Sequence, residues 1–187
     1  MQSSRWQLPS TLTRADGETR RVGVEIELQG IAIAELAELV AATLSGAATA
    51  VSSAEYRIDV PDSGAWRVEI DLALLKELAR EQRPDNGRDA DLLGTLAVDA
   101  LQAASSIIVP CEIVSPPIPV DRLPAIMDPL VDALRRAGAK GTRQSLLYAF
   151  GLHLNVEPPD LEADTIIRHL KAFICLHDWI ADESQID

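Results

Sequence analysis

The sequence predicts an α+β fold, in which helices cover one face of a largely antiparallel sheet. Strand-like segments alternate apolar with polar side chains, so each has one face for a core and one for solvent. Between them lie stretches whose apolar residues recur every three or four positions, as in amphipathic helices. One-sided strands mixed with such helices are typical of an antiparallel sheet with helices packed against one face.

Composition and length indicate a globular protein of one domain, or a large part of one. It has 187 residues, of which 47% are hydrophobic, enough to build a core. The 17 Lys and Arg against 29 Asp and Glu give a net charge of −12, which argues against binding to nucleic-acid phosphates. The N-terminus does not resemble a signal peptide, and no apolar run reaches the ~18 residues of a membrane span. Cys111 and Cys175 lie far apart and form no CxxC motif, which argues against a disulfide framework or a zinc site. We therefore expect a cytoplasmic protein that binds neither nucleic acid nor membrane.

The first half of the domain is expected to open with a strand and a helix. Residues 1–19 are polar and are expected to be a flexible N-terminal segment, followed by a domain over residues 20–187. Strict alternation predicts a strand over 21–29. Helical spacing predicts a helix over 32–44, with Gly46 as the residue that stops it.

A hairpin is expected next in the chain. Its strands are the alternating runs 55–60 and 65–71, and the residues Pro-Asp-Ser-Gly at 61–64 are typical of a turn between them. A short helix over 72–80 and a polar surface loop over 81–90 follow.

The second half alternates helices with strands. We expect a helix over 89–104, a strand over 106–114 ended by paired prolines, and a helix over 121–137. A strand over 147–157 and an amphipathic helix over 163–180 then close the chain.

The polar faces of these strands contain candidate metal ligands. Glu25 and Glu27 point to the same side of the first strand, roughly 7 Å apart. If the strands are neighbours, Asp71, Glu112 and His153 join them on one face. Crowded carboxylates repel one another unless cations neutralise them, and Mg²⁺ shares oxygen ligands with waters and substrate phosphates, so Mg²⁺ with a nucleotide is the expected ligand. A merely solvated sheet face shows the same alternation and remains the alternative.

Four ordered motifs resemble the amidoligase family of the carboxylate–amine ligase superfamily, which includes glutamate–cysteine ligase and, more distantly, glutamine synthetase. They are VGVEIEL at 22–28, WRVEID at 66–71, CEIVSPP at 111–117 and GLHLNV at 151–156. The resemblance covers about residues 21 to 180. Because relatives normally continue beyond the helix after the histidine motif, we expect this chain to lack C-terminal strands.

The resemblance implies a curved catalytic core like that of glutamine synthetase and glutamate–cysteine ligase, with Mg²⁺ and ATP on its concave face and helices outside. It also implies roles for six residues. The implied metal ligands are Glu25, Glu27, Asp71, Glu112 and His153; the implied catalytic residues are Glu25, Glu27, Glu112 and His153; the implied nucleotide contacts are Glu27, Glu112, His153 and Ser115.

The activity implied by the resemblance is ATP- and Mg²⁺-dependent formation of an amide bond through an acyl phosphate. The substrates would be a carboxylate and an amine, either small molecules or peptides. Two other functions stay open at this point. One is a truncated relative without catalysis that serves as a binding module with a partner chain. The other is a two-metal phosphoesterase, which uses similar carboxylates but does not account for the four ordered motifs. Assembly as a homo-oligomer or with a partner chain is also expected.

Overall fold

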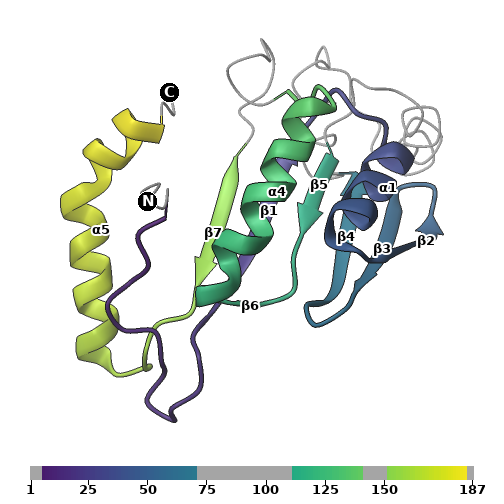
Figure 1. The fold of residues 1–187 in the computed structure, drawn as a ribbon. Helices are drawn as coiled ribbons and strands as arrows, with labels where there is room; N and C mark the ends of the chain where they lie inside the picture. The colour runs from purple at the N-terminus through teal and green to yellow at the C-terminus, as the bar shows by residue number, and fades with distance from the viewer. Residues whose placement is uncertain (1–5, 71–110, 141–150, 185–187) are drawn as a thin grey trace, which may run out of the picture.

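The structure is a computed structural model that describes residues 6–70, 111–140 and 151–184. The described residues form an open seven-stranded sheet and three α-helices, which confirms the α+β class (Figure 1). All strand pairs in the described residues are antiparallel. The elements are β1 (Arg21–Leu28), α1 (Ile33–Leu44), β2 (Ala47–Ser52), β3 (Glu55–Val60), β4 (Gly64–Ile70), β5 (Cys111–Val114), β6 (Ile118–Pro119), a 3₁₀ turn (Val120–Arg122), α4 (Leu123–Arg136), β7 (Leu152–Val156) and α5 (Ala163–Ser184).

Strand β1 lies inside the sheet, between neighbours from distant parts of the chain. The strand order is β2-β3-β4-β5-β1-β6, and β7 also pairs with β1. Val22 pairs with both β6 and β7, and Glu25 pairs with both β5 and β7. A residue in a strand has only two sides for pairing, so β5 and β6 lie along one edge of β1 and β7 lies along the other.

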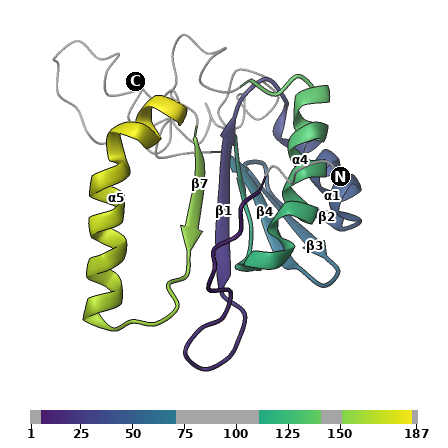
Figure 2. The same cartoon turned by 60° about the vertical axis from the view of Figure 1, so that its left-hand side comes forward.

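Helices α1 and α4 cover one face of this sheet (Figures 1 and 2). Alternate strand positions point to them and are buried, as the predicted periodicity requires. Trp66 and Val68 of β4 are fully buried, and the indole N–H of Trp66 donates a 2.8 Å hydrogen bond to Oγ of Ser63. The helices add Leu36, Val40, Met127 and Leu130, among others, to the same core. Every second position of β1, β4 and β5 therefore faces away from the helices.

The end of α1 differs in detail from the prediction. Ser45, rather than Gly46, takes the left-handed conformation that ends the helix, with φ 55°. Gly46 donates a 2.8 Å hydrogen bond to the carbonyl of Ala41, and a Cβ on it would lie 2.8 Å from the carbonyl oxygen of Asp59. Gly46 is therefore needed because β3 passes close to its backbone.

The predicted elements within the described residues are confirmed, with two strands added. The first strand, the helix over 32–44, the hairpin and the helices over 121–137 and 163–180 are all present within a few residues of the expected bounds. Strand β2 was not predicted, because its small residues show little apolar alternation. Strand β6 was not predicted either, because it has only two residues and follows the paired prolines.

Several predictions fall on residues that the structure does not describe. These are the helices over 72–80 and 89–104, the loop over 81–90, and the first parts of the strands over 106–114 and 147–157. The flexibility of residues 1–19 also stays a prediction; among them, the indole of Trp6 donates a 2.9 Å hydrogen bond to Asp128 of α4. Within the described ranges, no helix combines the length and apolar character that crossing a bilayer requires.

The apolar sides of β7 and α5 differ from expectation. In the strand predicted over 147–157, alternation sets Leu152, Leu154 and Val156 opposite the polar side chains and so predicts that they face the core, but their exposed fractions are 41–50%. Helix α5 stands outside the β7 edge (Figures 1 and 2), and its predicted apolar face is 47–63% exposed. That face consists of Ile166, Leu170, Phe173 and Ile174. In the described structure, α1 and α4 alone cover the core.

The two indoles Trp66 and Trp179 give a matched test of this core. Trp66→Ala should lower the free energy of unfolding by about 3 to 5 kcal/mol, because it removes a fully buried ring. Trp179 is 61% exposed, so Trp179→Ala should change it by only about 0.5 kcal/mol. Urea unfolding followed by circular dichroism measures both. Equal effects of the two substitutions would contradict the described core.

The two thiols should react at very different rates. Cys111 is buried beneath the helices, and burial raises the pKa of its thiol to about 11, whereas Cys175 on α5 is exposed. At pH 8 a thiol-specific disulfide reagent should therefore titrate one thiol quickly and the second only after unfolding in urea. Cys175→Ser should abolish the fast phase. Rapid reaction of Cys111 in the folded protein would contradict the packing of β5.

Candidate functional site

The side of the sheet that faces away from α1 and α4 brings three predicted site residues together. Glu25 of β1 and His153 of β7 are cross-strand partners, and Nδ1 of His153 lies 3.1 Å from Oε2 of Glu25. The same nitrogen lies 3.9 Å from Oε1 of Glu27. The Glu27 side chain is 19% exposed and that of Glu25 34%, while the imidazole is 53% exposed. One imidazole therefore faces two carboxylates at an accessible position.

Two residues that the sequence analysis did not select hold these carboxylates in place. The side-chain amide of Asn155 donates a 3.0 Å hydrogen bond to Oε1 of Glu25, and the backbone N–H of Gly151 donates a 3.1 Å bond to Oε2 of Glu27. A Cβ at position 151 would lie 3.1 Å from Nε2 of His153, so the glycine leaves room for the ring. The signal for Asn155 was its spacing, two residues after His153 on the same strand face.

A row of four glutamates crosses the same face. Glu55 pairs with Glu69, Glu69 with Glu112, and Glu112 with Glu27, so the row runs from β3 through β4 and β5 to β1. All four residues are partly buried. Like charges directly opposite each other destabilise a sheet, and partial burial weakens the screening by salt. The row therefore has a cost in free energy that a bound cation would reduce.

Glu55 and Glu69 were not among the predicted site residues. Glu69 was visible as the polar residue two positions before Asp71, on the same strand face. Glu55 could not be found in this way, because its place in the row follows from the register of β3 against β4. Asp71, the remaining predicted metal ligand, lies outside the described residues.

Ser115 follows β5 at the point where pairing passes to β6. It is 8% exposed, and its Oγ accepts a 2.8 Å hydrogen bond from the buried N–H of Val24. Its own N–H donates to the carbonyl of Val24 at 2.8 Å. Ser115 also lines a cavity of about 440 Å³ on the polar face. It thus supports the backbone of β1, and its predicted contact with a nucleotide stays a prediction.

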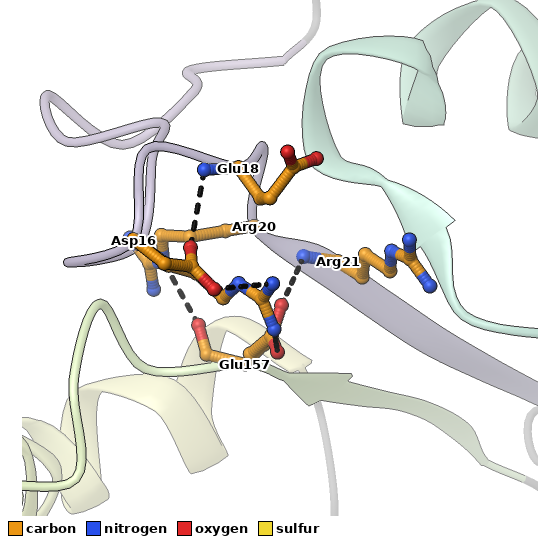
Figure 3. A network of polar contacts seen from close by, with 6 residues as sticks. Asp16, Glu18, Arg20, Arg21 and Glu157 are labelled. Atoms are coloured by element: carbon orange, nitrogen blue, oxygen red, sulfur yellow. Dashed lines mark hydrogen bonds and ion pairs between the residues drawn. The ribbon is translucent and has the colours of Figure 1, made fainter.

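A network of charged residues fixes the far end of β7 against β1 (Figure 3). The Glu157 carboxylate accepts hydrogen bonds of 3.0 Å from Arg14 and 2.9 Å from the N–H of Arg21, whose side chain extends away from it. Buried Arg20 donates from Nε to the Glu157 carbonyl at 2.8 Å. The hydrogen bond to Glu157 raises the pKa of Arg14 above its ordinary value. These contacts hold the register that places His153 opposite Glu25.

A second cavity, of about 710 Å³, adjoins this network. Its lining includes Arg14, Arg21, Gly23 and Asn155. Because Asn155 also binds the Glu25 carboxylate, the cavity lies next to the carboxylate pair. Its volume falls in the range of about 300 to 1,000 Å³ that is usual for ligand pockets.

Glu25, Glu27 and His153 offer some, but not all, of the ligands that a hard cation such as Mg²⁺ requires. Carboxylate oxygens are the ligands that Mg²⁺ prefers, and an imidazole can complete such a shell. Within residues 6–70, 111–140 and 151–184, no group of three or more His, Cys, Asp or Glu side chains is arranged as a metal site. Mg²⁺ usually takes only one or two protein carboxylates and fills its shell with water and substrate phosphates, so Glu25 and Glu27 fit this smaller set.

Fold and site together define an α+β protein with a carboxylate-rich sheet face beside ligand-sized cavities. A family model described as "putative amidoligase enzyme" matches residues 18–187, so the chain belongs to the amidoligase family, a family of ligases by its description. The resemblance found in the four motifs is thereby confirmed. Searches of curated proteins and of solved structures return no match.

The structural role of Ser115 gives a test within the site. Ser115→Ala should lower the free energy of unfolding by about 1 to 3 kcal/mol, because the buried N–H of Val24 loses its side-chain acceptor. Ser53→Ala, at an exposed serine between β2 and β3, is the control and should have almost no effect. Urea unfolding measures both. An Ser115→Ala protein as stable as wild type would mean that this hydrogen bond does not support β1.

Proposed function

We propose that this protein is an ATP- and Mg²⁺-dependent carboxylate–amine ligase that forms amide bonds. The main support is the coincidence of family and geometry. The chain belongs to the amidoligase family, and Glu25, Glu27, Glu112 and His153, from three of the four family motifs, lie at paired positions on the sheet face opposite α1 and α4. The proposal includes a curved core of the glutamine synthetase type, with this face on its concave side.

The proposed reaction has two steps. A carboxylate oxygen of the acid substrate attacks the γ-phosphorus of ATP, the bond from that phosphorus to the β,γ-bridging oxygen breaks, and ADP leaves. The amine nitrogen then attacks the acyl carbon, phosphate leaves with its bridging oxygen, and the nitrogen loses a proton. Phosphoryl transfer depends mainly on positioning and on neutralising charge, so no protein nucleophile is required. Bound Mg²⁺ would supply that neutralisation.

The residues take the following roles in the proposal. Glu25 and Glu27 bind Mg²⁺, because they are partly exposed carboxylates crowded with like charge. His153 faces both carboxylates, and its contact with Glu25 supports a role in which the ring would lie beside a bound metal or phosphate. Glu112, opposite Glu27, joins the same shell or contacts the nucleotide. Asp71 and Ser115 complete the proposed set as a metal ligand and a nucleotide contact.

The nucleotide site is tested by thermal unfolding in the presence of ATP alone, of Mg²⁺ alone, and of both ligands together. At about 100 times the Kd, ligand should stabilise the wild type by about 2.7 kcal/mol, seen as a higher Tm. This shift should need both ligands and should vanish in Glu25→Gln/Glu27→Gln. The ligand-free double mutant should be at least as stable as wild type, because the substitutions remove mutual repulsion.

The control is Glu35→Gln/Glu38→Gln, which makes the same charge change at exposed positions of α1. It should keep the full shift with Mg²⁺ and ATP. A shift that survives in Glu25→Gln/Glu27→Gln would place the nucleotide elsewhere. A large loss of Tm in the ligand-free double mutant would instead show that the two glutamates are structural.

A turnover assay tests the reaction itself. Release of ADP by the wild type should require both a carboxylic acid and an amine, and hydroxylamine used as the amine should give a hydroxamate. His153→Gln should lower this rate by about 100-fold or more if the ring helps neutralise the transferring phosphoryl group. ADP release that is independent of the acid would contradict a ligase.

A further inference from the structure

Arg57 and Arg67 face each other directly across β3 and β4. Like charges at directly opposite positions destabilise a sheet. Because the chain has 29 acidic residues against 17 basic ones, an arginine on a strand would be expected to pair more often with an acidic residue than with a second arginine. The row of four glutamates lies next to this pair on the same face, because Glu55 precedes Arg57 by two residues and Glu69 follows Arg67 by two. Across β3 and β4, arginine therefore lies opposite arginine and glutamate opposite glutamate, whereas a merely solvated face would gain from pairing opposite charges across strands.

Both arginines line the cavity of about 440 Å³ on the polar face, together with Glu55, Val114 and Ser115. This volume lies within the range of ligand pockets, about 300 to 1,000 Å³. The two side chains are 55% and 52% exposed, so their guanidinium groups are open to a ligand.

The orientation of Arg57 is fixed by Asp59 on its own strand. Nε and one terminal nitrogen of Arg57 donate to Asp59 at 3.0 and 2.7 Å, and this contact lowers the pKa of the Asp59 carboxyl. Among the described residues, the other terminal nitrogen, Nη1, has no hydrogen-bond partner. Nε of Arg67 forms an ion pair with Oε2 of Glu69 at 3.6 Å, which is beyond hydrogen-bond length, so the guanidinium keeps its hydrogen-bond donors for a ligand.

We propose that Arg57 and Arg67 form an oxyanion subsite that binds a carboxylate or phosphate group. The planar donor fork of arginine matches both groups. Arg67, Val114 and Glu25 occupy paired positions on three neighbouring strands, so the subsite lies about 10 Å along the face from the proposed metal site. If the proposed ligase function holds, the ligand is an acid substrate with a second anionic group, or the nucleotide itself.

The subsite can be tested without Mg²⁺ or ATP, so its failure is separable from failure of the ligase proposal. The arginine Nε–Hε signals are followed by NMR while inorganic phosphate, or the dicarboxylate glutarate, replaces chloride at constant ionic strength. The signals of Arg57 and Arg67 should shift and saturate, while that of exposed Arg136 on α4 should not. Saturation with phosphate alone would identify a phosphate subsite, and saturation with glutarate alone would identify a carboxylate subsite.

Substitutions assign the effect to this pair. Arg67→Gln should weaken binding of the saturating anion by about tenfold or more, because it removes a charge-assisted contact. Arg136→Gln, with the same charge change elsewhere, should bind as wild type. Shifts that stay linear and equal at all three arginines, or unchanged binding by Arg67→Gln, would overturn the proposal.

Discussion

The antiparallel pairing of β1 with β5 on one side and β7 on the other determines the rest of the structure. It brings together segments that lie more than eighty residues apart in the sequence and fixes which side chains share a face. Glu25 meets His153, and Glu27 meets Glu112, because of this register alone. A slip of one residue would turn the core positions of β1 to the polar face, so the buried face under α1 and α4 also protects the site.

The two faces of the sheet have opposite energetic roles. Trp66, Val68 and their neighbours bury apolar area against the helices and stabilise the fold. The other face places carboxylate opposite carboxylate and arginine opposite arginine, which lowers stability. Ligands of opposite charge would recover this free energy on binding. A stable core thus allows a charge pattern that is unfavourable in the free protein and suited to a cation next to an anion.

The sequence was enough to predict which faces of β1, β4 and β5 are buried, because strand periodicity depends only on local alternation. From the sequence it was also possible to select Glu25, Glu27, Glu112 and His153 as candidate site residues. The strand order and the registers could not be predicted from the sequence, because they arise from pairing between distant segments. For the same reason, the cross-strand pairs Glu55–Glu69 and Arg57–Arg67 could not be predicted. Periodicity also assigned Leu152 and its neighbours in β7 to the core, although α1 and α4 do not cover them.

The proposed ligase function requires that the face of β1 and β7 opposite α1 and α4 binds a divalent cation with a nucleotide. Paramagnetic broadening of backbone amide signals by Mn²⁺, used in place of Mg²⁺ with ATP present, measures the position of the cation directly. Broadening should be strongest at Glu25, Glu27 and His153 and absent at α1, and excess Mg²⁺ should reverse it. Broadening confined to other acidic positions such as Asp178 and Asp182, or spread evenly over the acidic surface, would contradict the claim.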